Sequence, residues 1–264
     1  MKARPSKKNI HPFDEISGAW CNTDASTSSI MESVSFVTPV LESFFIHTVN
    51  ESINTLSGEH TPLLERGKSF IQEEANHSRI HGLFNEHLFA YLGKKPPGLQ
   101  LTYWVLKQIR TKVSLHSRLL LAAALEHIAA VLSKVYLQEQ SNMTMTSDYA
   151  QAMFLMHANE EIGHRSVVFD LWLNHGTSNI LSRMLVIALI LSGGALYLIG
   201  SFPWILYKKH IHHSKTHMIT AILLSLGNIA FRMLQALFDR RTYCVIYELF
   251  SFIRPNYHPD HLIQ

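Results

Sequence analysis

The sequence predicts an all-α protein that folds as a helical bundle. Three observations support this prediction. Apolar residues recur at helical spacing through several long segments, short stretches with glycine or proline separate them, and no segment alternates polar and apolar residues as a strand does. With 264 residues, of which 47% are hydrophobic and 16% charged, the chain is long enough to bury one substantial core. We therefore expect one bundle domain at residues 28–264, preceded by a flexible, solvated arm at residues 1–27.

The first two predicted helices lie in the N-terminal third of the chain. Apolar residues recur at helical spacing over residues 30–56, and Pro39 interrupts them. Because proline is best tolerated in the first turn of a helix, we expect this helix to begin near Thr38. A second helix is expected over residues 61–92, where a glycine and a Pro-Pro-Gly run stop it.

Three more helices are predicted before the composition changes. Their expected ranges are 101–113, 114–139 and about 148–174, each with apolar residues at helical spacing. Ser147 or Asp148 is a candidate N-cap for the last of them, because a short polar side chain can accept a hydrogen bond from the first free backbone N–H groups. Long helices joined by short loops indicate a bundle in which neighbours run antiparallel.

An apolar C-terminal helical hairpin is predicted within about residues 178–253. Residues 184–207 form 24 positions without a formal charge, which could cross a hydrocarbon core of about 30 Å at about 1.5 Å per residue. Glycines and Pro203 argue against an unbroken helix there, and the second apolar stretch, 218–237, contains Arg232. Three interpretations stay open: a buried hairpin of the bundle, a membrane-associated hairpin, and a single span.

Charge and cysteine content restrict the partners and the compartment. Basic residues between the two apolar stretches would suit an anionic membrane surface, with a solvated loop as the alternative; they are Lys208, Lys209, His210, His212, His213, Lys215 and His217. The net charge of +3 is small and the cations do not cluster with aromatic residues, so we expect no nucleic-acid partner. Cys21 and Cys244 lie far apart, and no apolar stretch follows the basic N-terminus, so we expect a cytoplasmic protein without a signal peptide. A homodimer is left open.

A Glu-x-x-His motif occurs twice and carries the functional prediction. Glu74 and His77 form the first motif, and Glu161 and His164 form the second, 87 residues later. Residues at i and i+3 project from one face of a helix, so each pair can reach one metal ion. One such motif is common by chance, whereas two on different long helices indicate a metal site.

Two further glutamates and one histidine complete a ligand set for two metal ions. Glu42 and Glu126 each lie inside an apolar helical run, where a charge is costly unless it is paired or bound to a metal. His157 lies one helical turn before Glu161. A dimetal site in a bundle takes two Glu-x-x-His motifs and one Glu from each of two other helices. The predicted ligands are therefore Glu42, Glu74, His77, Glu126, His157, Glu161 and His164.

Other interpretations of these residues stay open. Glu42 and Glu126 could pair with buried cations, the motif histidines could be plain core residues, and His157 could support a ligand. His81, one turn after His77, could be a further ligand or could orient Glu74. The neighbours of the ligands, Glu73 and Glu160, are expected to be solvated or hydrogen-bonded supports. Residues expected to hydrogen-bond to the ligands are Asp170, His127 and Arg165.

The stretches that carry these motifs resemble a bacterial family of predicted metal-dependent hydrolases with ferritin-like dimetal motifs. The matching segments are 41–46, 70–81 and 156–170, and the likeness extends from about residue 11 to 250. In two places the chain departs from the expected pattern: Gly163 replaces an acidic residue and Glu73 replaces a glutamine. Neither change removes a predicted ligand. The order of the ligands is also similar to that of the di-iron arylamine N-oxygenases, which implies oxygen chemistry.

The ligand set favours two iron ions, with manganese and zinc as alternatives, because mixed carboxylate and imidazole ligation differs from thiolate-rich structural zinc. We expect a non-haem di-iron oxidoreductase that oxidises a small or lipid-like substrate, with catalytic carboxylates at Glu42, Glu74, Glu126 and Glu161. Such an enzyme needs an external electron donor, because the sequence has no Gly-rich nucleotide loop or cysteine cluster. The alternative is a metal-dependent hydrolase that uses the same dimetal site. Metal storage or a purely structural bundle is a third interpretation.

Overall fold

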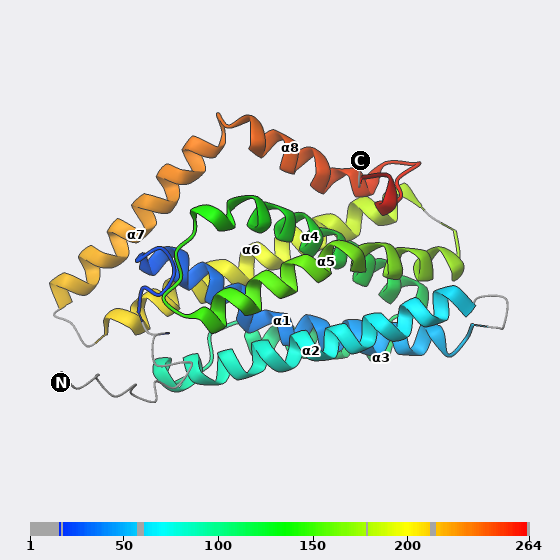
Figure 1. Ribbon diagram of the computed structural model, residues 1–264, viewed down its shortest axis with the longest axis horizontal. Helices are drawn as coiled ribbons and strands as arrows, with labels where there is room; N and C mark the ends of the chain where they lie inside the picture. The colour runs from blue at the N-terminus through cyan, green and yellow to red at the C-terminus, as the bar shows by residue number, and fades with distance from the viewer. Residues whose placement is uncertain (1–15, 17, 57–60, 178, 212–214, 263–264) are drawn as a thin grey trace, which may run out of the picture.

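The computed structural model describes residue 16 and residues 18–56, 61–177, 179–211 and 215–262 (Figure 1). These residues form helices and contain no β-strand; Cys21 and Met145 form one isolated bridge. The prediction of an all-α helical bundle is therefore confirmed. The predicted basic residues His212 and His213 lie outside the described residues.

Four long helices build the centre of the bundle. They are α1 (Ala25–Ile53), α2 (Thr61–Leu92), α4 (Leu115–Glu139) and α5 (Asp148–Asn174). These helices lie along the length of the molecule, and the pairs α1–α2 and α4–α5 make the most extensive contacts (Figure 1). A shorter helix, α3 (Leu99–Lys112), packs on α1. The predicted helix ranges from residue 61 to residue 174 are confirmed within two residues at each end.

Helix α1 begins well before the predicted position near Thr38, so that prediction is wrong. Asp24 caps the helix, since its carboxylate accepts hydrogen bonds from the backbone N–H groups of Ser26 and Thr27. Pro39 therefore lies inside α1 and cannot donate a hydrogen bond to the carbonyl of Ser35. The side-chain amide of Asn85 on α2 donates to this carbonyl instead, at 2.7 Å. A contact from another helix thus replaces the hydrogen bond that the proline removes.

The described part of the predicted arm is packed rather than solvated. Ile16, Trp20 and Cys21 are buried, and the indole N–H of Trp20 donates to Glu32 at 2.7 Å. The backbone N–H of Asn22 donates to a carbonyl in the α4–α5 loop. The expectation of solvated residues up to 27 is wrong for these positions, because apolar side chains anchor the segment. A division of the chain into an arm and one bundle domain stays a prediction.

The C-terminal helices enclose one side of the bundle and then leave it. Helix α6 (Ile180–His210) packs on α1 and α4, α7 (Lys215–Ala236) extends away from the bundle, and α8 (Arg240–Leu249) returns to α4 (Figure 1). The predicted hairpin of α6 and α7 is present. Pro203 does not end α6, contrary to the expected break, since the helix is continuous and buries one face through residues such as Tyr197 and Ile205.

Two apolar clusters lie at either end of the four-helix centre, with a polar layer between them. The first includes Phe44 on α1, Phe70 on α2 and Phe169 on α5. The second includes Phe36 on α1 and Phe84 on α2. Each of the four central helices therefore passes from apolar packing into the polar layer, and α1, α2 and α5 contribute buried residues to both clusters. This arrangement places polar side chains at a depth where water is excluded.

Candidate metal centre

The polar layer contains the seven predicted metal ligands. Six of them are buried, and His157 is half-buried. One side chain comes from α1, two from α2, one from α4 and three from α5, so all four central helices contribute. The layer brings together Glu42, Glu74, His77, Glu126, His157, Glu161 and His164.

Two groups of these side chains are close enough to hold metal ions. Glu74, His77, Glu161 and His164 each offer one ligand atom, and these atoms lie within 4.8 Å of one another. Across the two motifs, His164 Nδ1 lies 2.7 Å from Glu74 Oε1, and His77 Nδ1 lies 3.7 Å from Glu161 Oε1. Each histidine thus faces the glutamate of the other helix.

The second group consists of Glu42, His77 and His157, again within 4.8 Å. It shares His77 with the first group, and the rings of His77 and His157 stack with centroids 4.2 Å apart. Glu126 is in neither group. It is fully buried, and its carboxylate interacts electrostatically with Glu161 and Glu74. The two groups and Glu126 form one continuous cluster.

Two glutamates orient the motif histidines. His77 Nε2 lies 2.7 Å from Glu160 Oε2, and His164 Nε2 lies 2.8 Å from Glu73 Oε2. Each contact crosses between α2 and α5. With Nε2 held by a carboxylate, the Nδ1 atom of each ring faces the cluster, as expected of a metal-binding imidazole supported from behind. Glu73 and Glu160 are therefore hydrogen-bonded supports, one of the two roles that the sequence left open for them.

A chain of hydrogen bonds orients His157 through His81. The Ser35 hydroxyl donates to Asn85 Oδ1 at 2.7 Å and accepts from His81 Nδ1 at 2.8 Å. His81 Nε2 is then an acceptor, and it lies 2.9 Å from His157 Nδ1. Burial lowers the pKa of His81 well below its ordinary value, and electrostatic interaction with the neighbouring His157 acts in the same direction, which keeps the His81 ring neutral.

This chain of hydrogen bonds fixes the tautomer of His157. Its Nδ1–H donates to His81, which leaves the Nε2 lone pair directed at the cluster, 2.9 Å from Glu161 Oε1. His81 therefore supports His157 and does not orient Glu74. The sequence left this role undetermined because it depends on Ser35 and Asn85, which lie on α1 and α2.

The electrostatics of the cluster indicate that positive charge is required. Burial, followed by the charges of neighbouring carboxylates, raises the pKa of Glu42 and of Glu126 well above the ordinary value. Burial opposes the charge of His164, yet hydrogen bonds to Glu161 and Glu74 raise its pKa to about 12. The carboxylate oxygens of Glu42 and Glu126 accept no hydrogen bond from the described residues. Buried acceptors without donors, beside imidazoles of matching geometry, fit divalent metal ions.

The alternative pairings do not occur among the described residues. No Arg or Lys side chain forms an ion pair with Glu42 or Glu126 there; the basic side chains that lie nearest to Glu42 are the imidazoles of His77 and His157. The three residues expected to hydrogen-bond to the ligands make other contacts, so that prediction is wrong. Asp170 pairs with Arg66 and His258, Arg165 with Glu248, and His127 with Tyr257.

The doubled glutamates of the two motifs were the signal in the sequence for the residues that hydrogen-bond to the motif histidines. Each motif reads Glu-Glu-x-x-His, and the first glutamate of each pair supports the histidine of the other motif. A residue adjacent to a helical ligand points about 100° away from it, so it cannot share the same metal but can reach the neighbouring helix. The doubling was visible in the sequence, whereas its direction across the helix pair was not.

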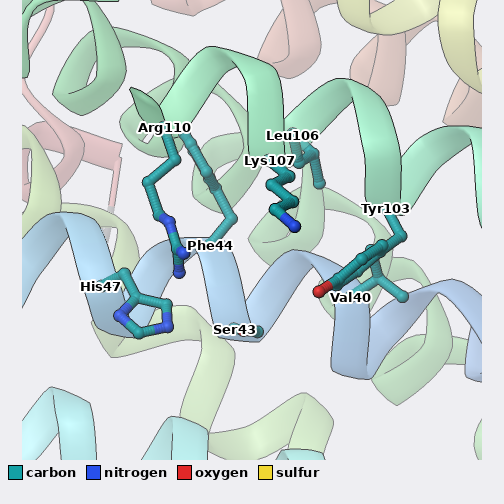
Figure 2. A pocket seen from close by; sticks show the side chains of 8 residues that line it. All are labelled: Val40, Ser43, Phe44, His47, Tyr103, Leu106, Lys107 and Arg110. Atoms are coloured by element: carbon teal, nitrogen blue, oxygen red, sulfur yellow. The ribbon is translucent and has the colours of Figure 1, made fainter. Parts of the chain in front are cut away.

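A pocket of about 280 Å³ lies between α1 and α3 (Figure 2). Lys107, Arg110 and Tyr103 project from α3 toward α1, above an apolar floor that includes Val40 and Phe44. Glu42 lies two positions from both floor residues, so its side chain leaves α1 on the opposite side. The pocket suits an anionic group on an apolar molecule, and α1 separates it from the predicted ligands.

A second hollow, of about 370 Å³, lies between α1 and α2. Ala75 and Ser78 line it, and each follows a predicted ligand in the sequence. Ser43 and His47 of α1 line both hollows, so the two open beside each other on the same helix. More of the residues that line this second hollow are adjacent in sequence to predicted ligands than of those that line the first.

Fold and site together define a class: an all-α bundle with a buried Glu/His cluster able to hold metal ions. The sequence profile of a family described as predicted metal-dependent hydrolases matches residues 6–262. The chain therefore belongs to this family, and the resemblance noted from the motifs is confirmed. No curated protein and no solved structure matches the chain.

Proposed function

We propose that the protein is a dinuclear metal enzyme, and that its reaction is the oxygen-dependent oxidation of a small or lipid-like substrate. One observation carries this proposal: four carboxylates and three imidazoles converge in one layer, where all but His157 are buried. Iron is the metal that this donor set favours, with manganese and zinc as alternatives. When bound, a pair of redox-active metal ions would supply the electron transfer to oxygen that amino acid side chains cannot provide.

The side chains have distinct roles in this proposal. Glu42, Glu74, Glu126 and Glu161 would neutralise the charge of two metal ions, and His77, His157 and His164 would complete the ligand set. Glu73, Glu160 and His81 hold the three imidazoles in the required orientation. The two apolar clusters keep water from the reacting groups. Reducing equivalents would come from an external donor protein in the cytoplasm.

The second candidate is hydrolysis at the same dimetal site, and the description of the family favours it. Two redox-silent metal ions could generate a hydroxide and polarise an ester or phosphate. Water and substrate would then have to reach the buried cluster, and the hollow beside Ala75 and Ser78 is the approach nearest to the ligands in sequence. The burial of the cluster makes hydrolysis the weaker candidate on geometric grounds.

Metal content and oxygen uptake separate the two candidates. The protein is purified from iron-supplemented cells, its metals are measured per chain, and oxygen consumption is followed after anaerobic loading with ferrous iron. About two irons per chain and rapid oxygen consumption support the oxidase proposal. Two zinc ions, together with hydrolysis of a panel of esters and phosphates, would support the second candidate. A chain that takes up no stoichiometric metal contradicts both.

A further inference from the structure

Helix α6 exposes large apolar side chains over residues 180–199 and again at Tyr207. Leu189 and Leu196 are 70% and 71% exposed, which is unusual for leucine in a water-soluble bundle. The exposed set on this helix is Ile180, Leu181, Met184, Leu185, Leu189, Leu191, Leu196, Leu198, Ile199 and Tyr207. Helix α7 also exposes Leu223, Leu224 and Phe231. We call this surface of α6 and α7 the apolar platform.

Polar groups are almost absent from the α6 part of the platform, whereas α7 also exposes Asn228 and Gln235. Between residues 184 and 200, Ser192 is the only exposed polar side chain. Interfaces between proteins carry about one hydrogen bond per 100–200 Å² and a polar rim around an apolar centre. A surface with this little hydrogen-bonding capacity fits hydrocarbon better than it fits a second protein. The chemistry of the platform therefore favours lipid.

Cations and aromatic rings gather at the C-terminal end of α6. The Nζ atom of Lys208 lies against Gly93, directly before Lys94 and Lys95 at the end of α2. It also lies 6.0 Å from the centroid of the Trp204 ring. None of these three lysines forms an ion pair with any residue that the structure describes. Lysines beside tryptophan are typical of the boundary between hydrocarbon and lipid headgroups, where anionic lipids attract them.

One expected cation takes no part in this group. Lys209 is buried, and its ammonium group pairs with Glu32 at 2.7 Å and donates to the carbonyl of Gly18. The expectation that it contributes to a basic surface is wrong, because its side chain points into the bundle. Lys209 instead joins α6 to α1, which holds the platform rigidly on the four-helix centre.

The packing of the helices argues against a helix that crosses the bilayer. Three helices, α1, α4 and α6, are long and apolar enough to span a membrane. However, α6 packs on α1, and α1 packs on α2. A spanning α6 would draw α2 into the hydrocarbon, together with its exposed charges at Glu65, Lys68 and Glu86.

We propose that the apolar platform lies in the plane of a membrane, with its leucines and isoleucines among the acyl chains and Lys94, Lys95 and Lys208 at anionic headgroups. The protein would be held at one leaflet, with α2 and its charges facing water. The interaction is independent of the reaction at the metal centre. It also gives the chain direct access to apolar molecules dissolved in the bilayer.

Vesicle binding of the full chain tests the proposal. Flotation is measured with vesicles of phosphatidylcholine alone and of phosphatidylcholine with phosphatidylglycerol. The double variant Leu189→Asp, Leu196→Asp should lose at least tenfold in binding to both, since two charges would enter hydrocarbon. The control is Leu83→Asp, which changes a 43%-exposed leucine on the charged face of α2 and should leave binding unchanged. Helical circular dichroism and metal content verify that each variant is folded.

The lysines and the depth of insertion are tested separately. Lys94→Gln with Lys208→Gln should weaken binding to the anionic vesicles about fivefold per lysine and leave binding to neutral vesicles unchanged. Alkaline carbonate should release the wild-type protein, because it does not span. Cleavage by a protease enclosed in the vesicles would overturn the in-plane arrangement. A different outcome would overturn the lipid assignment in favour of a second copy of the chain. In that outcome the wild-type protein forms dimers that do not bind vesicles, and the α6 substitutions convert these dimers to monomers.

Discussion

The centre of the bundle buries four carboxylates where most proteins place apolar side chains, whereas α6 exposes leucines and isoleucines where most helices carry polar ones. For an isolated chain in water, both arrangements are costly, since buried like charges repel and exposed apolar surface is hydrated. In the two proposals made above, each is explained by something other than protein: metal ions at the centre, and lipid at the platform. The difference between these regions teaches that departures from ordinary burial are themselves evidence of function.

The two regions also differ in how well their side chains are supported. Each histidine of the metal centre has a partner that fixes its ring, namely Glu160, Glu73 or His81. The outward side chains of α6 have no such partners among the described residues, and they need none to contact fluid hydrocarbon. Directional ligation demands orientation, whereas hydrophobic burial demands only area. Substitutions should therefore have larger and more specific effects at the centre than at the platform.

Loss of a central ligand should have the largest effect. Glu161 belongs to the first group of candidate ligands, with Glu74, His77 and His164. Its Oε1 atom lies 2.9 Å from His157 Nε2. The variant Glu161→Ala should lower the metal content from about two ions per chain to about one or fewer, because the histidines of both ligand groups lose a carboxylate that lies beside all of them. Elemental analysis of the purified variant measures this. Glu86→Ala, on the exposed face of α2, is the matched control, and a full metal complement in Glu161→Ala would contradict the assignment of α5.

Removal of His81 should have the next largest effect. The variant His81→Ala frees Nδ1 of His157, so the ring no longer presents Nε2 in a fixed orientation. Supports of this kind are worth roughly 10- to 100-fold in metal affinity. Competition with a chelator measures the affinity. His116→Ala, which removes a histidine hydrogen-bonded to Trp172 instead, should change it little. Equal losses in both variants would assign His81 a merely structural role.

The pH dependence of stability should have opposite signs with and without metal. Glu42 and Glu126 have raised pKa values, chiefly through burial, so the folded metal-free chain holds protons that the unfolded chain releases. Its stability should therefore fall as pH rises from about 5 to about 8, by up to about 1.4 kcal/mol per pH unit for each proton held. The raised pKa values of His77 and His164 act in the same direction above neutrality.

Metal reverses this dependence, because ligands must lose their protons to bind. Urea unfolding at both pH values, with chelator and with metal, measures the two slopes. Glu126→Gln removes one of the titrating carboxyls, so it should flatten the slope of the metal-free chain and stabilise it at the higher pH. A metal-free chain that gains stability as pH rises would be inconsistent with a repulsive carboxylate cluster.

Polar substitution on the platform should have the smallest effect on stability. Leu196→Ser should change the free energy of unfolding in buffer by no more than about 0.5 kcal/mol, since the side chain makes few contacts in the bundle. Phe169→Ala, in the apolar cluster beside the metal layer, should cost about 3–5 kcal/mol. Denaturant titration compares the two. A loss of several kcal/mol in Leu196→Ser would mean that α6 is covered by protein.

Local patterns in the sequence determined the fold class and the residues of the candidate site. Helical spacing, caps such as Ser147 and glycine-containing breaks depend on neighbours within a few residues, so they predicted the helices from residue 61 to 174. The order Glu, Glu-x-x-His, Glu, Glu-x-x-His was sufficient to place candidate metal ligands on four different helices. All six of these side chains, together with His157, meet in one polar layer.

Contacts between residues far apart in the chain decided the rest. Asn85 lets α1 continue through Pro39, and Glu32 draws Lys209 into the bundle. The supports of the histidines likewise reach across from one helix to another, from Glu73 and Glu160 to rings more than 80 residues away. Spacing along one helix gives the direction in which a side chain leaves it, but the partner it meets depends on how the helices pack. The sequence therefore determined which residues could bind metal, and the tertiary structure alone decided what holds them in place.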